Sequence, residues 1–342
     1  MHRPNRLSLD RQALQSNWRW LQSTAGVEAG AAVKADGYGL GIHAVVDALL
    51  EAGCREFFVS SWVEAAFIHE RFPEAAVVVL HGVGPDDVLA ASDSSARPVL
   101  NSVKQIEIWK EIADGRACDI MFDTGMNRIG LSVAESEALT GLRITTVHSH
   151  LACADEDHPL NKRQLERFRI IKGRVTAARF SLANSGGIML GPDYSFDLVR
   201  PGLALYGGIP RPEGRDHIRR VVSLQAQVVQ RRQVQPGETV GYGGSFQAKR
   251  QLETAIINLG YGDGYCRGFQ RAGFAIREGK HLPVVGRVSM DLTAIDCSLS
   301  PEVKEGDWLD IDFDLEGTAE TTGISQYELL TGLNQRFERN WF

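Results

Sequence analysis

The sequence predicts an α/β protein in which a (β/α)₈ barrel of the TIM type is followed by a mainly β domain. From residue 30 to about residue 205, a unit of short apolar run, turn and amphipathic helix recurs. After about residue 217, short alternating runs bounded by Gly, Pro or Asp replace it. A chain of 342 residues has room for about two domains. We therefore expect a barrel over residues 1–217 and a mainly β domain over residues 218–342.

Eight apolar runs give the expected strands of the barrel. They lie at 31–33, 57–60, 77–80, 98–100, 119–122, 144–147, 179–182 and 197–199. A closed barrel of this type has eight strands, so the number favours a barrel over a doubly wound sheet, which is the alternative architecture.

Helices are expected between these runs, and strands are expected after the barrel. The helical segments are 44–52, 63–71, 103–114 and 164–177, with Gly53 and Gly115 closing the first and third. The strands of the second domain are expected at 223–234, 252–259, 283–289, 292–296 and 307–312. The tail from residue 326 to residue 342 is expected to begin as a helix and then fade.

Composition excludes several classes of function. Lys and Arg number 37 and Asp and Glu number 43, so the net charge of −6, spread along the chain, argues against a nucleic-acid or anionic-membrane partner. No apolar run approaches the roughly 18 residues of a membrane-spanning helix, and the charged N-terminal segment does not resemble a secretory signal. The five cysteines contain no Cys-x-x-Cys pair. We expect reduced thiols in a cytoplasmic protein.

Chemistry-bearing residues follow the expected strands, where a barrel keeps its active site. Lys34 ends the first run, where desolvation lowers the pKa of an amine and favours Schiff-base chemistry; an ion-paired rim lysine is the alternative. Arg128, after the fifth run, suits a carboxylate, or is a solvated loop residue. His148 and His150 follow the sixth run and could share a metal, but no further ligands follow the other strands. No metal site is therefore expected.

Small residues follow the last two runs, in Asn184-Ser-Gly-Gly and in Arg200-Pro-Gly-Leu. In barrels these two loops commonly bind phosphate, because small side chains let backbone N–H groups approach the anion. Turn glycines without a ligand are the alternative. A phosphate site beside a strand-end lysine points to pyridoxal phosphate as the cofactor.

Seven motifs, taken in order over nearly the whole chain, resemble those of the alanine racemase family. They are Val-Lys-Ala-Asp-Gly-Tyr-Gly at 33–39, Asp-Thr-Gly-Met-Asn-Arg at 123–128, Ser-His-Leu-Ala-Cys-Ala-Asp at 149–155, Asn-Ser at 184–185, Val-Arg-Pro-Gly at 199–202, Gly-Tyr-Gly-Asp-Gly-Tyr at 260–265 and Arg-Val-Ser-Met-Asp at 287–291. The resemblance implies interconversion of L-alanine and D-alanine, with D-alanine used in a bacterial cell wall. It also implies a homodimer in which each β domain completes the partner's active site.

The resemblance assigns roles to single residues. Lys34 would hold pyridoxal phosphate and act as the base on one face of the substrate Cα, and Tyr242 of the other subunit would act on the opposite face. Arg128 and His150 would be the cations that favour the Tyr242 phenolate, and Arg200 would face the pyridine nitrogen. The other expected cofactor contacts are Tyr38, His150, Asn184, Ser185, Gly202, Leu203 and Tyr327, and the expected substrate contacts are Arg128, Tyr261 and Met290.

Four positions depart from the family pattern, Leu40 and Gly241 among them, and two of the four bear on Arg128 and the cofactor ring. Met121 stands where many members carry a lysine whose carbamate orients the arginine, so Arg128 needs another support, such as Asn127. Ser181 stands where some members carry a histidine near the cofactor ring. These departures put rate and substrate range in doubt more than reaction type.

Four other functions are weighed against an alanine racemase. A racemase of broader specificity shares the machinery. A non-catalytic pyridoxal-phosphate-binding protein shares the barrel and its lysine but lacks the β domain. A basic-amino-acid decarboxylase favours an acidic residue where Arg200 stands, and a metal-dependent hydrolase would use His148 and His150.

Overall fold

The computed structural model describes residues 2–342, which form two compact units. One unit is Leu14–Arg219, and the other joins Arg220–Phe342 to the described residues up to Ala13. The expected division after residue 217 lies near the end of the first unit. The N-terminal strand β1 (Asn5–Leu9) nevertheless belongs to the second unit, because it pairs antiparallel with a strand more than 200 residues later.

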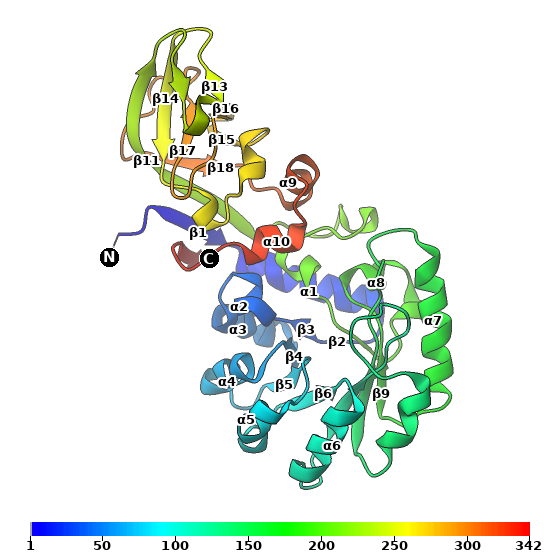
Figure 1. Ribbon diagram of the computed structural model, residues 1–342. Coiled ribbons are helices and arrows are strands. Elements are labelled where there is room, and N and C mark those ends of the chain that lie inside the picture. The colour runs from blue at the N-terminus through cyan, green and yellow to red at the C-terminus, as the bar shows by residue number, and fades with distance from the viewer. Residues whose placement is uncertain (1) are drawn as a thin grey trace. The chain divides into compact units, whose positions relative to one another are not determined.

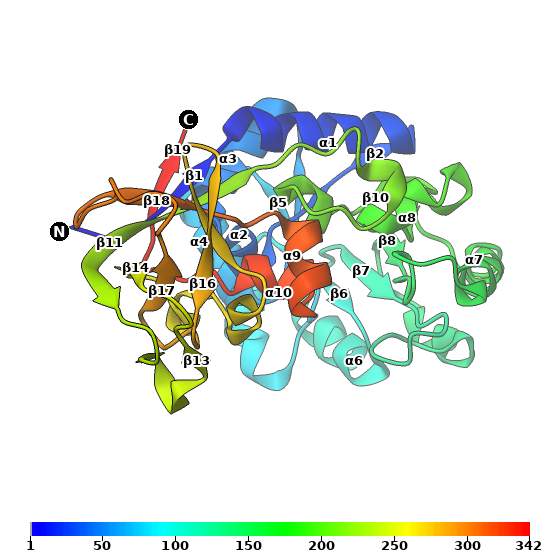
Figure 2. The ribbon, with the colours of Figure 1, turned by 90° about the horizontal axis from the view of Figure 1, so that it is seen from above.

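The first unit is a barrel of short parallel strands (Figures 1 and 2). Seven of them are neighbours in chain order: β3 (Ala31–Ala32), β4 (Glu56–Val59), β5 (Ala76–Val79), β6 (Arg97–Leu100), β7 (Cys118–Met121), β8 (Ile144–His148) and β9 (Arg179–Ser181). The eighth, β10 (Leu198–Val199), pairs with β2 (Glu28–Ala29), which leads into β3. It also meets β9, since Arg200 N–H donates to the Ala183 carbonyl at 2.9 Å. Each expected run overlaps one of these strands, which confirms the barrel.

The strands are buried on both faces, as parallel strands covered by helices are. All four residues of β4, Glu-Phe-Phe-Val, are buried. Gly30, between β2 and β3, lets the strand pass close to Phe58, because a Cβ there would lie 2.6 Å from a carbon of the Phe58 ring. The closure of the barrel therefore depends on a small residue at this point.

Helices cover the outside of the barrel. They are α1 (Arg11–Ala25), α2 (Lys34–Tyr38), α3 (Ile42–Ala52), α4 (Trp62–Arg71), α5 (Val88–Asp93), α6 (Val103–Ile112), α7 (Pro159–Lys172) and α8 (Ser185–Met189). The helices expected at 44–52, 63–71 and 103–114 are present as α3, α4 and α6. The helix expected at 164–177 is wrong by about one turn, because Pro159 opens α7 and the His158 ring accepts from Leu160 N–H.

Short 3-10 helices lie in the connections between the strands and helices. In the barrel they are η1 (Pro85–Asp87), η2 (Val133–Leu139), η3 (Pro192–Tyr194), η4 (Leu203–Tyr206) and η5 (Pro212–Gly214). In the second unit they are η6 (Tyr242–Gly244), η7 (Tyr261–Asp263) and η8 (Arg267–Gln270). Three of the eight begin with proline, which suits a first helical position because it has no N–H to satisfy.

The second unit is a mainly antiparallel β domain organised by one long strand, β11 (Val222–Val234). Its first half pairs with β1 and with β18 (Trp308–Ile311), and its second half pairs with β14 (Leu252–Ile257). The remaining elements are β12 (Thr239–Val240), β13 (Phe246–Gln247), β15 (Phe274–Arg277), β16 (Lys280–Val285), β17 (Thr293–Asp296), α9 (Leu315–Thr322), α10 (Gln326–Thr331) and β19 (Glu338–Trp341). The order β14-β17-β16-β15-β18-β11, with β11 paired again to β14, closes this sheet.

The C-terminal tail differs from the expectation. The helix α10 begins at Gln326, but the chain then returns as β19, which pairs in parallel with β1. The two strands lie at opposite ends of the sequence, so a local pattern does not reveal their pairing. The expectation of a helix that fades to the end was therefore wrong for the last residues.

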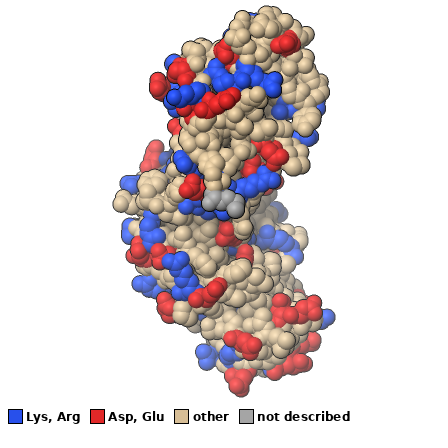
Figure 3. Space-filling model, turned by 90° about the vertical axis from the view of Figure 1, so that its left-hand side faces the viewer, with Lys and Arg blue, Asp and Glu red and all other residues tan. Residues whose placement is uncertain are grey.

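Charge and cysteine placement agree with the composition. On the face that Figure 3 shows, basic and acidic side chains are interspersed in small groups. All five cysteines are free, and burial raises the pKa of the Cys54 and Cys118 thiols to about 12. Among residues 2–342, no helix combines the length and the apolar character required to cross a bilayer.

A buried network of charged side chains crosses the interior of the barrel. Arg179 Nη2 donates to Glu56 at 2.9 Å, although β9 and β4 are not neighbours in the sheet. Arg97 joins Glu56 to Asp119, with Arg97 Nε 3.2 Å from Asp119 Oδ1. Asp119 also accepts from His148 Nε2 at 3.1 Å. Although burial opposes it, the hydrogen bond from His148 and the charge of Arg97 hold the pKa of Asp119 below its usual value.

The Asp119→Asn variant is expected to lower the thermal midpoint by about 5–10 °C, because breaking a buried ion pair costs about 3 kcal/mol or more. Asp216→Asn, at an exposed position of the same unit, is the matched control. Since the pKa of Asp119 is lowered on folding, its stabilisation is present above the unfolded value and is lost as the pH falls toward the folded value. Scanning calorimetry from pH 7 to pH 4 should show the thermal midpoints of the wild type and of Asp119→Asn converging. Equal midpoints of these two proteins at pH 7 would show that the Asp119 carboxylate does not stabilise the fold.

Candidate active site

The carboxyl ends of the barrel strands bring several expected residues together. Lys34 follows β3, Arg128 follows β7, His150 follows β8 and Arg200 follows β10. The charges of Arg200, Arg128 and Lys34 all act on the His150 ring. The mouth of the barrel is therefore a cluster of basic side chains, as the positions after the strands predicted.

Lys34 opens a turn of unusual conformation. The next four residues, Ala35 to Tyr38, all have positive φ, with values of 55°, 55°, 63° and 55°. Only Gly37 is a glycine, and the left-handed conformation costs other residues about 1–2 kcal/mol each. Gly37 packs the turn onto α3, since a Cβ there would lie 2.9 Å from Val45 Cγ2. The sequence pattern missed this turn because Ala, Asp and Tyr rarely adopt it.

The surroundings of the Lys34 amine favour its neutral form. Desolvation lowers its pKa, the positive charge of Arg128 lowers it further, and the carboxylate of Glu64 opposes both. A larger fraction of this amine is therefore neutral near pH 7 than for an exposed lysine. A neutral amine can act as a nucleophile or as a base.

A corner suited to an anion lies beside this turn. The Tyr38 ring stacks on Tyr206 with centroids 4.6 Å apart, and a Cβ on Gly202 would lie 2.4 Å from the Tyr38 hydroxyl oxygen. Ser185 Oγ accepts from Gly202 N–H at 3.0 Å and from Ala204 N–H at 3.2 Å. Two hydroxyl groups and backbone N–H groups thus meet at one place. Small side chains leave room there for a phosphate-sized group.

The two remaining loop residues support this corner. Asn184 caps α8, since its Oδ1 accepts from Gly187 N–H at 2.9 Å. Leu203 begins η4 and is buried. The structure therefore shows Asn184 and Leu203 shaping the backbone next to Ser185 and Gly202.

Arg200 is a fixed cation beneath the mouth. Its Nη2 donates to the Ser149 carbonyl at 2.6 Å, and its Nη1 donates to Ser181 Oγ, which in turn donates to the Leu198 carbonyl. Burial lowers the pKa of Arg200 to about 10, so the group stays charged near pH 7. A ligand atom facing it meets a cation that has no proton to release at that pH.

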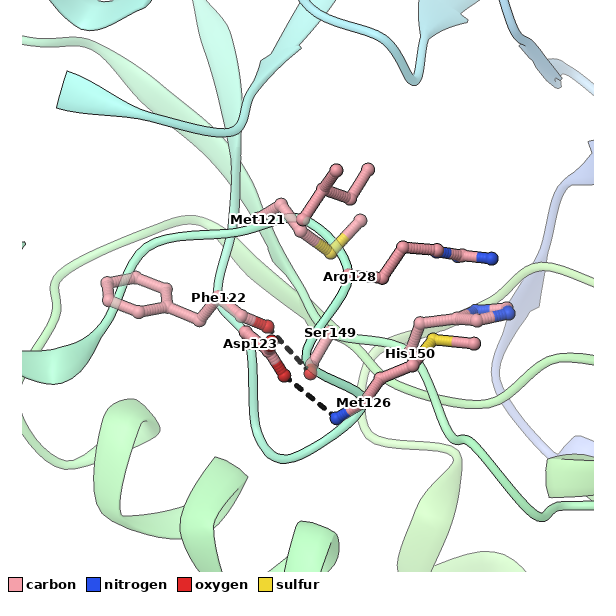
Figure 4. A pocket seen from close by; sticks show the side chains of 8 residues that line it. Met121, Phe122, Asp123, Met126, Arg128, Ser149 and His150 are labelled. Carbon is pink, nitrogen blue, oxygen red and sulfur yellow. Dashed lines mark hydrogen bonds between the residues drawn. The ribbon is translucent and has the colours of Figure 1, made fainter. Parts of the chain in front are cut away.

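His150 is neutral, which corrects one expectation. Desolvation and the charges of Arg200, Arg128 and Lys34 lower its pKa to about 3. It cannot therefore serve as a cation that favours a phenolate. Arg128, whose side chain runs beside it (Figure 4), is the remaining candidate for that role.

Arg128 is exposed at the mouth. It lies in a small pocket with Met121, Met126 and His150. Within residues 2–342 its guanidinium makes no hydrogen bond, and Asn127, which the sequence suggested as its support, has a left-handed backbone with φ of 55° and does not bond to it. No hydrogen bond within the described residues therefore fixes the direction of the Arg128 side chain.

The histidines do not support the alternative of a metal site. His148 is buried against Asp119 in the barrel interior, whereas His150 lies beside Arg128. In the described part of the chain, no three His, Cys, Asp or Glu side chains are grouped as metal ligands would be.

The expected residues of the second unit lie on adjoining loops. Tyr261 N–H donates to the Ser289 carbonyl at 3.0 Å, and a Cβ on Gly286 would lie 2.6 Å from the Val240 carbonyl oxygen. These contacts bring the loops of Tyr242, Tyr261 and Met290 together, an arrangement that their spacing in the chain does not predict. The Tyr242 side chain is 72% exposed and that of Met290 is 52% exposed. Tyr327 lies separately, on α10.

Glu64 is the residue of this region that the sequence analysis missed. Its Oε1 accepts from Ala35 N–H and its Oε2 accepts from Ser60 N–H, both at 2.7 Å. The Ser-x-x-Glu spacing from Ser61 to Glu64 is visible in the sequence, but it indicates only a helix start.

Comparison with known proteins covers both units. The family model for the alanine racemase N-terminal domain matches residues 9–210, and that for the C-terminal domain matches residues 221–341. The chain is 41% identical to a catabolic alanine racemase of Agrobacterium fabrum, over 98% of this chain and 91% of that protein. It is 38% identical to the biosynthetic alanine racemase of the same organism, over 99% and 94%. The crystal structure of alanine racemase from Bartonella henselae, with covalently bound pyridoxal phosphate, superposes with a TM-score of 0.93 at 34% identity and covers 99% of both chains.

The state of His150 can be measured directly. In protein labelled with ¹⁵N-histidine, the His150 resonances, identified by their absence in His150→Gln, should report a neutral ring from pH 8 down to about pH 4.5. Among the charges that act on His150, that of Arg200 has the largest effect, so the pKa of His150 should rise when Arg200 is replaced by Met. Protonation of His150 near pH 6 in the wild type would refute this description of the mouth.

Proposed function

The chain belongs to the alanine racemase family, and from this premise we propose that it interconverts L-alanine and D-alanine with pyridoxal phosphate as cofactor. The observation that carries the proposal is the desolvated Lys34 amine, which opens the turn that carries Tyr38 of the anion corner and shares the mouth with the buried Arg200. An enzyme with this activity is an isomerase.

The residues of the mouth fit this cofactor. The corner of Tyr38, Ser185 and Gly202 suits its phosphate, and Arg200 suits its ring nitrogen. Asn184, Leu203, His150 and Tyr327 are proposed as further contacts. When bound, pyridoxal phosphate supplies an electron-withdrawing conjugated ring that acidifies the Cα–H bond of an amino acid.

Proton exchange at Cα uses two bases, one on each face. Lys34 would hold the cofactor, and once the substrate amine has displaced it, the freed Lys34 amine would serve as the base on one face of Cα, a role that its lowered pKa supports. Tyr242 of a second subunit serves on the opposite face. Its high exposure in its own chain supports the idea that it acts in a partner's site. A single fixed base would have to cross the plane of the carbanion to exchange the proton between faces.

Arg200 and Arg128 have separate electrostatic roles toward the cofactor ring and the substrate. Arg200 would face the ring nitrogen without giving it a proton, because a guanidinium stays charged near pH 7. This limits electron withdrawal by the ring and favours proton exchange over transamination. Arg128 binds the substrate carboxylate and favours the Tyr242 phenolate, with Met290 and Tyr261 of the partner completing the entrance.

The assembly and setting are part of the proposal. We propose a homodimer with two composite sites, working in the cytoplasm, where free and largely unreactive thiols such as Cys54 and Cys118 persist. The use of D-alanine for a bacterial cell wall accords with the biosynthetic relative. A racemase of broader specificity is the second candidate, since Arg128 lacks a hydrogen-bonded support within the described chain.

Loss of the lysine amine should abolish the reaction. The Lys34→Ala variant, purified with pyridoxal phosphate, should lack the borohydride-reducible visible band of the wild type and should lose roughly 10³-fold or more in kcat for L-alanine. Chiral chromatography of the product measures the rate, and Lys104→Ala, at an exposed position of α6, is the matched control. A wild-type band without turnover of any amino acid would instead support a binding protein.

Complementation tests the shared site. Lys34→Ala and Tyr242→Phe should each be inactive as homodimers. Subunits mixed one to one and allowed to exchange should recover about a quarter of wild-type activity, because half of the dimers are mixed and each mixed dimer has one intact site. Recovery requires that Lys34 and Tyr242 act from different chains. No recovery, with exchange verified by mass spectrometry, would place both bases on one chain.

A further inference from the structure

The Lys34 turn needs a restraint from outside itself. Ala35, Asp36 and Tyr38 adopt the left-handed conformation without being glycine. Such strain persists only where the surrounding structure enforces it. Bonds within the segment, such as Gly37 N–H to the Val33 carbonyl at 2.9 Å and Ile42 N–H to Asp36 Oδ1 at 2.8 Å, shape the turn but do not fix it to the barrel.

Glu64 supplies a link between neighbouring strand ends. Its Oε1 accepts from the N–H of Ala35, the residue directly after Lys34. Its Oε2 accepts from the N–H of Ser60, the residue directly after β4. The two strand ends are adjacent, because β3 pairs with β4. One carboxylate therefore ties the start of the lysine turn to the next strand of the barrel.

The position of Glu64 on its own helix makes this link rigid. It lies in the first turn of α4, and its own N–H donates to the N-cap Ser61. A glutamate at this place in a capping box bonds to the backbone N–H of the N-cap residue. Here one oxygen accepts from Ser60, one residue before the N-cap, and the other accepts from Ala35 in the α2 turn, which lies beside β3 and β4 in Figure 1.

We propose that Glu64 is a positioning residue that holds the Lys34 amine at its reactive place by clamping the Ala35 and Ser60 amides. The proposal deepens the function given above, because it takes Lys34 as the reactive amine. The negative charge of Glu64 also offsets the charge of Arg128 at that amine. Its role does not require contact with cofactor or substrate.

The test compares Glu64→Gln with Glu70→Gln, which changes an exposed glutamate on the same helix. The first readout is hydrogen exchange of the apoprotein, followed by mass spectrometry of peptides that contain Ala35 and Ser60. A neutral amide has one acceptor oxygen for two donors, so exchange at one of the two amides should accelerate at least about tenfold in Glu64→Gln only. The thermal midpoint should change by no more than about 2 °C, since glutamine keeps the size of the side chain.

The second readout is covalent capture. The rate at which Lys34 takes up pyridoxal phosphate, measured by borohydride reduction and peptide mapping, should fall about tenfold or more in Glu64→Gln. The kcat for alanine should fall by a similar factor while KM stays within about twofold, because Arg128 is untouched. Unchanged exchange and capture in Glu64→Gln, or equal losses in Glu70→Gln, would overturn the proposal. Absence of Lys34 labelling and turnover in the wild type would instead contradict the proposed function.

Discussion

Positive charge gathered at one end of the barrel is the constraint that organises the site. The charges of Lys34, Arg128 and Arg200 all act on His150; Lys34 and Arg200 are desolvated by burial, whereas Arg128 is exposed. Like charges at such short range in a low dielectric cost free energy, and the cost falls when a titratable group gives up its proton or an anion binds. The low pKa of His150 and the lowered pKa of Lys34 both follow in part from this gathering of positive charge. A phosphate and a carboxylate are the ligands that such a mouth favours.

Carboxylates inside the barrel determine which of the cations at its mouth keeps its proton. Asp119 and Glu56 raise the pKa of Arg200 against the effect of burial. They belong to the network that Arg97 and Arg179 complete across the strands. Lys34 lies farther from these carboxylates, and the anion that acts on it is Glu64. Arg200 therefore remains a permanent cation, whereas the lysine can exchange its proton. Arg200 and Lys34 differ in this way because the carboxylates that act on them are different.

Local patterns predicted the barrel well, because each strand and helix carries its own periodicity. The eight strands lie where the apolar runs are, and Gly53 ends α3 with φ of 110°. Features that depend on distant partners could not be predicted: β1 pairs with β19 from the far end of the chain. The left-handed turn after Lys34 was also hidden, because Ala, Asp and Tyr rarely adopt that conformation, and so was the low pKa of His150, because the charges that lower it follow other strands. The family motifs supplied Tyr242 and Met290, for which spacing alone gave no role.

The departures from the family pattern at Ser181 and Met121 have unequal consequences. Ser181 keeps an acceptor for Arg200 and donates its own proton to the Leu198 carbonyl, so the change from histidine leaves the arginine anchored. Met121 offers no such replacement, because a thioether provides at most a weak acceptor for a guanidinium. Among the mouth cations described, Arg128 thus has no side-chain hydrogen bond to orient it, whereas Arg200 has two. Binding of the substrate carboxylate should therefore be the property that the change at Met121 alters most, while the proton exchange itself rests on groups that both departures leave intact.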